Sequence, residues 1–218
     1  MSLAQKLRVK PGKRVDLSEW KTDATPGVKD ETSAAAETAK HIRQLEQYQY
    51  KLHAEGRRSL LIVLQGMDAS GKDGVVRHVM SGFDPLGCDV QAFKAPTPEE
   101  RAHDFLWRIH RVAPAAGGVT IFNRSHYEDV LVVRVHDLVP KKVWSQRYAR
   151  INAFEDLLAA GGTTGVKFFL HIGRAEQKRR LLERLDDPGK SGKFNVGDSE
   201  EHAGGRRERE TCGDERRQ

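Results

Sequence analysis

Residues 60–73 read LLIVLQGMDASGKD and join an apolar run to a glycine-rich turn that carries a lysine. The run at 60–64 consists of aliphatic and β-branched residues, which predicts a buried strand. The turn has the spacing Gly66-x-x-x-x-Gly71-Lys72, and this order of strand, turn and helix is typical of a phosphate-binding loop. Backbone N–H groups and the positive end of the helix then face one anion, and Lys72 reaches the outer phosphates.

Two acidic residues distinguish this loop from the common motif. Asp73 stands where a serine or threonine usually holds Mg²⁺, and Asp68 lies inside the turn. Two carboxylates would repel phosphate unless a divalent cation lay between them, so we predict a site for phosphate and metal. The alternative is a glycine-rich turn with a surface lysine. The residues predicted to line the phosphate site are Gly66, Met67, Ala69, Ser70, Gly71, Lys72 and Asp73.

Composition limits the class of protein. A chain of 218 residues with 38% hydrophobic residues can bury one sizeable core. Because we find no apolar run long enough to span a bilayer, no signal peptide and only two distant cysteines, we expect a cytoplasmic protein without a membrane partner. The formal net charge of +6 favours a polyanionic partner. Aromatic residues do not alternate with the basic ones, which argues against nucleic acid.

Strands and helices alternate along the chain. We predict strands at 60–64, 89–93, 119–122 and 166–172. We predict helices at 33–56, 72–80, 97–112, 130–135, 141–160 and 175–185. This alternation indicates an α/β fold, in which a mainly parallel sheet has helices on both faces and forms a three-layer sandwich.

Three regions are expected. Residues 1–32 form an extended N-terminal arm with a short anchor at Leu17 and Trp20. Residues 33–198 form a single domain with a lid around 174–194. Residues 199–218 contain no Leu, Ile, Val, Met, Phe, Tyr or Trp, so they cannot bury apolar surface and are predicted to be a disordered charged tail.

The end of the third predicted strand carries polar residues. Ligands of parallel sheets bind beyond the carboxyl ends of the strands, so Asn123, Arg124 and Glu128 should emerge beside the loop. The arginine can stabilise charge on a transferred phosphoryl group, and the other two can order metal-bound water. The alternative is a surface ion pair between Arg124 and Glu128. His126 fits no metal-site spacing and is interpreted as structural.

A basic helix supplies the last cluster. Arg180 and Arg184 are four residues apart and share a face, so they can act as a lid over a phosphate group. The alternative is a solvated face paired with Glu176 and Glu183. Lys94 after the second strand extends the positive track. A role for Arg134 or for Asp129 stays open.

Four stretches together resemble the polyphosphate kinase 2 family: GMDASGKDG (66–74), DFLWRIH (104–110), FNRSHYEDVLVVRVHD (122–137) and EQKRRLLERLDDPGK (176–190). The resemblance covers about residues 9–198. It implies a P-loop kinase-like fold and Mg²⁺-dependent phosphoryl transfer between inorganic polyphosphate and nucleoside mono- or diphosphates. It also implies a homo-oligomer, either a dimer or a tetramer. Asn123, where much of the family has aspartate, resembles the branch that phosphorylates both AMP and ADP.

The resemblance also assigns roles by motif position. Asp68 would hold Mg²⁺ and orient the acceptor phosphate, and Lys72 and Arg124 would bind the transferring phosphates. Arg180 and Arg184 would belong to the lid, with Lys94 and Arg134 as lesser phosphate contacts. From Ser199 the sequence departs from the family pattern, and we expect an altered or truncated C-terminus.

Three hypotheses about function therefore stand. The first is a kinase that reversibly converts AMP and ADP to ADP and ATP with polyphosphate. The second is a non-catalytic remnant that binds polyphosphate or nucleotide. The third is an ATP-dependent small-molecule kinase on the same P-loop fold.

Overall fold

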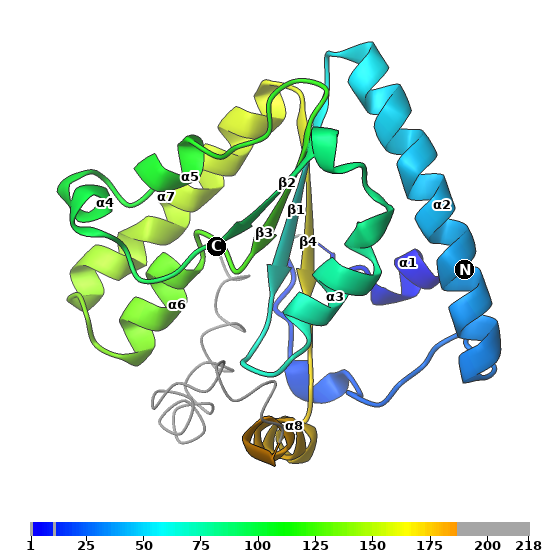
Figure 1. The fold of residues 1–218 in the computed structure, drawn as a ribbon. Helices are drawn as coiled ribbons and strands as arrows, with labels where there is room; N and C mark the ends of the chain where they lie inside the picture. Colours follow the sequence, from blue (N-terminus) through cyan, green and yellow to red (C-terminus); the bar gives the residue numbers. More distant parts are fainter. Residues whose placement is uncertain (1, 11, 187–218) are drawn as a thin grey trace.

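Four parallel strands form the central sheet of the computed structural model, which describes residues 2–10 and 12–186 (Figure 1). The strand order is β2-β3-β1-β4. The strands are β1 (Ser59–Gln65), β2 (Cys88–Ala92), β3 (Val119–Asn123) and β4 (Thr163–Phe169). Leu64 pairs in register with Asn123 on one side and with Phe168 on the other. This register brings the carboxyl ends of β1, β3 and β4 together at one end of the sheet.

Helices cover both faces of the sheet, with α4 to α7 on one face and α2 and α3 on the other (Figure 1). The α-helices are α1 (Leu3–Leu7), α2 (Glu31–Glu55), α3 (Lys72–His78), α4 (Pro98–Ala102), α5 (Trp107–His110), α6 (Glu128–Val135), α7 (Lys141–Ala160) and α8 (Arg174–Asp186). Short 3₁₀ helices span Leu17–Glu19, Met80–Gly82 and Pro85–Gly87. The predicted three-layer α/β architecture is confirmed. Among the described helices, none has the length and apolarity to cross a membrane.

The core has two halves because successive side chains of β1 point to opposite faces of the sheet. Leu61 and Val63 pack with Phe122 against α5, α6 and α7. Ile62 and Leu64 pack on the other face, where α2 and α3 contribute apolar side chains. Burial on both faces explains why β1 reads as a continuous apolar run. It also makes β1 a firm support for the loop that follows it.

Several predicted elements differ in extent from those of the structure, and three of the differences have the following form. The helix predicted at 97–112 is broken into α4 and α5, because His103 is extended and Asp104 Oδ1 accepts the backbone N–H of Leu106 at 2.9 Å. Strand β4 begins three residues earlier than predicted and ends at Phe169. Helix α2 begins at Glu31, because the Asp30 side chain caps it.

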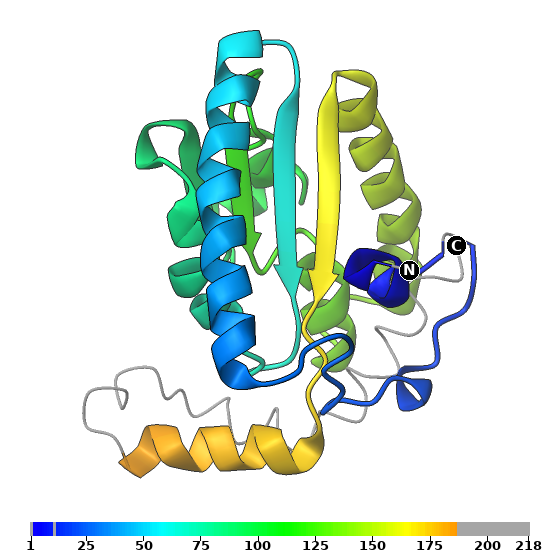
Figure 2. The same ribbon diagram turned by 90° about the vertical axis from the view of Figure 1, so that its right-hand side faces the viewer.

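Residues 2–10 and 12–30 pass beside the β4 edge of the sheet, where α1 lies next to that strand (Figure 2). Val15 is buried, while Leu17 and Trp20 are half-buried. The predicted tail at 199–218 and the part of the predicted lid beyond residue 186 lie outside the described residues.

Candidate functional site

The loop between β1 and α3 has the tight backbone that the glycine spacing predicts. Gly71 is left-handed, with φ 102°, and is the N-cap of α3. A Cβ on Gly66 would lie 2.7 Å from Ser70 Oγ and 2.8 Å from the carbonyl oxygen of Leu170. Glycine is therefore required at position 66 by space, because the loop folds back on the residue that follows β4.

Lys72 is the first residue of α3 and its side chain lies against the loop. The residue is 8% exposed, and its Nζ donates to the carbonyl oxygens of Gly66 at 2.5 Å and Met67 at 3.0 Å. Ser70 Oγ is buried and has no hydrogen-bond partner within the described part of the chain. A buried hydroxyl of this kind suits an anionic oxygen as its partner. The loop therefore offers a cation, a hydroxyl and a helix N-terminus to one ligand.

The end of β3 meets the loop through two side chains. Arg124 Nη2 donates to Asp68 Oδ1 at 2.6 Å, and Asn123 Nδ2 donates to Asp73 Oδ1 at 2.8 Å. The Arg124 backbone is left-handed, with φ 67°, which is uncommon for a residue that has a side chain. Its N–H donates to the carbonyl oxygen of Leu64 at 3.1 Å. The structure thus brings both loop acids and both strand residues together, as the order of elements predicts.

Glu128 contacts the residue that ends β1. Its Oε1 accepts a hydrogen bond from Gln65 Nε2 at 2.6 Å, and Gln65 Oε1 accepts one from the buried Ser125 hydroxyl at 3.4 Å. Gln65 ends β1 directly before the loop and was not predicted as a site residue. The sequence signal that could have identified Gln65 is its position as a polar residue at the end of an apolar strand.

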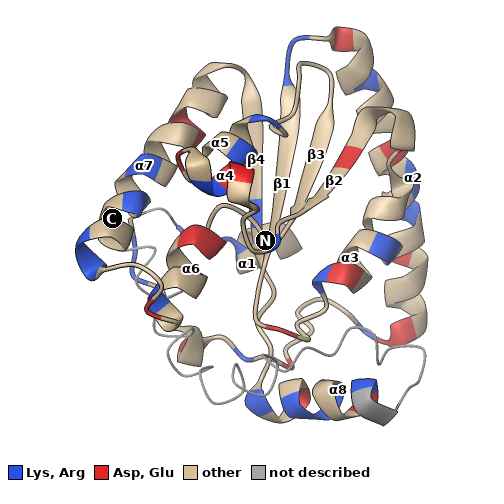
Figure 3. Ribbon diagram, turned by 60° about the vertical axis from the view of Figure 1, so that its left-hand side comes forward, with Lys and Arg blue, Asp and Glu red and all other residues tan. Residues whose placement is uncertain are grey.

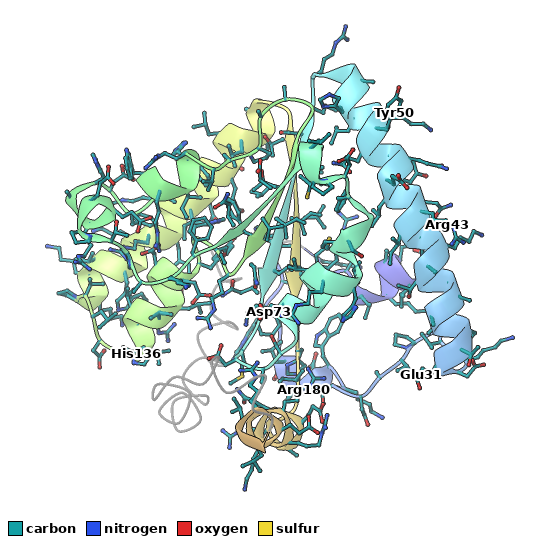
Figure 4. All side chains as sticks on the ribbon, viewed as in Figure 1. Glu31, Arg43, Tyr50, Asp73, His136 and Arg180 are labelled. Atoms are coloured by element: carbon teal, nitrogen blue, oxygen red, sulfur yellow. The ribbon has the colours of Figure 1, made fainter. Side chains whose placement is uncertain are left out.

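Helix α8 lies beneath the carboxyl ends of the strands, and Figure 4 shows Arg180 on this helix below Asp73 of α3. Arg180 Nη1 donates to the carbonyl oxygen of Ala69 at 3.1 Å, and Gln177 Nε2 donates to that of Asp68 at 3.1 Å. Gln177 is 3% exposed and was missed from sequence, although it lies three residues before Arg180 on the same face. Side chains of α8 therefore contact the loop by donating hydrogen bonds to backbone oxygens of the loop.

Acidic residues accompany the arginines of α8 (Figure 3). Arg179 pairs with Glu176 and Glu183, and Arg180 Nε also donates to Glu176 at 2.7 Å. Hydrogen bonds from the two arginines lower the pKa of Glu176 to about 2. The alternative, a solvated helix face whose arginines pair with glutamates, thus describes Arg179, whereas Arg180 also contacts the loop. Arg184 is half-buried one turn further along the helix.

Three further predicted or open residues lie on the α4 to α7 side. Asp129 is buried, and its Oδ2 lies 3.0 Å from Arg108 Nη2. Arg108 Nη1 donates to the carbonyl oxygen of Lys94 at 2.8 Å, while the Lys94 side chain is exposed. Arg134 lies over the ring of Trp144, 4.9 Å from the ring centroid. Asp129 therefore belongs to a buried ion pair between α5 and α6.

The acidic residues at the loop suit magnesium in their number and type. No group of three or more His, Cys, Asp or Glu residues in the described ranges is arranged to hold a metal ion. Mg²⁺ is usually bound in phosphoryl-transfer sites by one or two carboxylates together with substrate phosphates and water. Asp68 and Asp73 both belong to the loop predicted to bind phosphate, and so they fit this pattern.

Comparison with known proteins agrees with this geometry. The sequence model of the family described as Polyphosphate kinase 2 (PPK2) matches residues 28–205. An AMP/ADP-polyphosphate phosphotransferase of Meiothermus ruber is 50% identical over 198 residues, which cover 90% of this chain and 74% of that protein. An ADP-polyphosphate phosphotransferase of Rhodopseudomonas palustris is 43% identical over 209 residues, covering 90% of this chain and 72% of the relative.

A solved structure gives the same result. The crystal structure of Polyphosphate Kinase 2 from Arthrobacter aurescens TC1 superposes with a TM-score of 0.92 at 44% sequence identity, covering 99% of this chain and 77% of that one. Agreement in sequence and in fold over most of both chains leads to one conclusion. The chain belongs to the polyphosphate kinase 2 family.

Proposed function

We propose that this protein transfers phosphoryl groups between inorganic polyphosphate and AMP or ADP, forming ADP or ATP reversibly. The observation that carries the proposal is the meeting of Lys72, Arg124 and Arg180 around one phosphate loop. The printed activities of the Meiothermus and Rhodopseudomonas relatives name polyphosphate as one reactant and AMP or ADP as the other, which supports this choice over an ATP-dependent small-molecule kinase.

The proposed mechanism is in-line transfer between two bound phosphates. The acceptor is a phosphate oxygen that is already anionic, so no strong general base is needed. The loop amides and Lys72 would bind the phosphates on the α3 side, and Arg124 would approach from β3. Arg180 would close the site from α8. Catalysis then rests on positioning and on neutralising charge on the equatorial oxygens.

Magnesium is the proposed cofactor. Bound Mg²⁺ would neutralise charge on the phosphate oxygens that the loop holds. Asp68 is the proposed ligand, and Asp73 stands at the position from which the common motif contacts the ion. Asn123 and Glu128 are proposed to order the water around it. Arg184, Lys94 and Arg134 stay proposed as outer phosphate contacts.

The test is formation of ADP and ATP from AMP in the presence of polyphosphate and Mg²⁺. Lys72→Ala should lower the rate by about 10²- to 10³-fold, the effect typical of removing one preorganised group that stabilises transition-state charge. Lys40→Ala is the matched control, because Lys40 is exposed on α2 and its loss should leave the rate unchanged. A parallel reaction, with ATP in place of polyphosphate as the phosphoryl donor, tests the alternative of an ATP-dependent kinase.

Two outcomes would refute the proposal. One is a wild-type protein that forms no ADP or ATP from polyphosphate, which would favour the non-catalytic remnant if polyphosphate still bound. The other is a rate that is unaffected by Lys72→Ala. Assembly as a dimer or tetramer and a cytoplasmic location stay predictions, the first of which analytical ultracentrifugation would test.

A further inference from the structure

A polar cluster lies behind the turn that carries Arg124. Glu155 of α7 accepts a hydrogen bond from the Tyr127 hydroxyl at 2.7 Å, and its Oε1 lies 3.2 Å from His126 Nε2. Lys167 of β4 donates to Glu155 Oε2 at 2.7 Å and to the Tyr127 hydroxyl at 2.9 Å. Two elements, α7 and β4, thus converge on two consecutive residues of the turn.

The carboxylate at the centre of this cluster is ionised at neutral pH. Burial acts to raise the pKa of Glu155, but the hydrogen bond with His126 and the nearby Lys167 ammonium outweigh it and lower the pKa to about 2. An ionised acceptor makes stronger hydrogen bonds than a neutral one. His126 is completely buried, so its ring is held by packing as well.

The turn needs such support because of its backbone. A left-handed conformation at a residue with a side chain costs about 1–2 kcal/mol and persists only where the surroundings impose it. Arg124 adopts it immediately before Ser125, His126 and Tyr127. Ser125 is also fully buried, and its Oγ accepts the N–H of Tyr127 at 3.2 Å. Residues 125–127 are thereby fixed, and Arg124 is the first residue beyond them on the side of the loop.

We propose that Glu155, held by Lys167, is a positioning residue for phosphoryl transfer. Its hydrogen bonds fix residues 126 and 127, and this keeps the Arg124 backbone in the conformation that directs its guanidinium to Asp68. The inference rests on the proposed function, since it assigns Arg124 to the transferring phosphate. Glu155 itself has no place at the phosphate and acts only through the turn.

The first experiment compares Glu155→Ala with Glu155→Gln. A misplaced catalytic group lowers the rate by up to about 10²-fold, so we expect Glu155→Ala to lower kcat about 10- to 100-fold with little change in KM for polyphosphate. Glu155→Gln keeps an oxygen that accepts from Tyr127, and it should recover most of the loss. Tyr127→Phe removes two hydrogen bonds of the hydroxyl, one donated to Glu155 and one accepted from Lys167, without opening the fold, and it should lower kcat about fivefold.

A double-mutant cycle separates positioning from general destabilisation. Once Arg124→Ala has removed the guanidinium, adding Glu155→Ala should lower kcat less than twofold further. The inference would be overturned if the kcat losses of Arg124→Ala and Glu155→Ala multiplied in the double variant. It would also be overturned if Glu155→Ala and Tyr127→Phe left kcat unchanged while the wild type is active. A wild-type protein without transfer activity would overturn the proposed function and this inference together. An active wild-type enzyme whose Glu155→Ala and Tyr127→Phe variants keep the wild-type kcat would overturn the inference but not the proposed function.

Discussion

Replacing Asp129 with alanine tests the buried ion pair that joins α5 to α6. The Asp129 and Arg108 side chains are 9% and 7% exposed, and Asp129 Oδ2 lies 3.0 Å from Arg108 Nη2. Arg108 has one more carboxylate near it, that of Glu100 at 3.7 Å. Loss of the Asp129 carboxylate therefore leaves a guanidinium in the interior without its close partner.

The expected cost follows from that burial. Removing one member of a buried pair typically lowers the free energy of unfolding by about 3–5 kcal/mol, because the remaining charge stays removed from water without the opposite charge that compensated it. For a domain of this size the urea midpoint should fall by on the order of 1–2 M. A double variant, Arg108→Met with Asp129→Leu, removes both members of the close pair, so Arg108 is no longer left buried without its partner, and it should unfold at a higher urea concentration than Asp129→Ala.

The assay is equilibrium unfolding in urea followed by circular dichroism. Glu55→Ala is the matched control, because Glu55 pairs with an arginine, Arg58, at 2.8 Å but on the surface, where such pairs contribute about 0.2–1 kcal/mol. A loss below about 1 kcal/mol in Asp129→Ala would contradict the reasoning. So would a double variant less stable than the single one.

Two other predictions concern the loop and the Glu155 cluster. Gly66→Ala would place a Cβ 2.8 Å from the Leu170 carbonyl oxygen, so we expect the loop to shift and transfer to fall at least about tenfold, with about 1–3 kcal/mol lost in urea unfolding. Gly74→Ala, which meets nothing within 4 Å, should keep its activity, and an equal loss there would argue against a steric cause. For Glu155, the folded pKa of about 2 lies below the ordinary 4.5, so its contribution to stability is present above pH 4.5 and disappears as the pH falls to 2. Wild type should therefore lose about 2–3 kcal/mol across that range relative to Glu155→Gln, and parallel pH profiles of the two proteins would refute this.

The central fold and the loop were predictable because their signals are local. An apolar run followed by Gly66, Gly71 and Lys72 specifies strand, turn and helix within one stretch. The break between α4 and α5 was not predictable from periodicity. Ala102, Phe105 and Ile109 keep helical spacing across it, and the break depends on the Asp104 side chain bonding to a backbone N–H.

The contacts that complete the site lie beyond sequence patterns. Gln65 contacts Glu128, 63 residues away, and Gln177 contacts the carbonyl oxygen of Asp68, 109 residues away. Pairs at such separations depend on strand register and on the docking of α8, which no local motif encodes. The roles assigned to Lys72, Arg124 and the other site residues stay predictions until variants are assayed.

Asp68 connects two parts of the site that approach the loop from different directions. Its backbone oxygen accepts from Gln177 of α8, while its carboxylate accepts from Arg124 at the end of β3. A displacement of α8 therefore moves the same residue that holds the Arg124 guanidinium. Docking of α8 and placement of the transferring phosphate should thus be coupled through one residue of the loop.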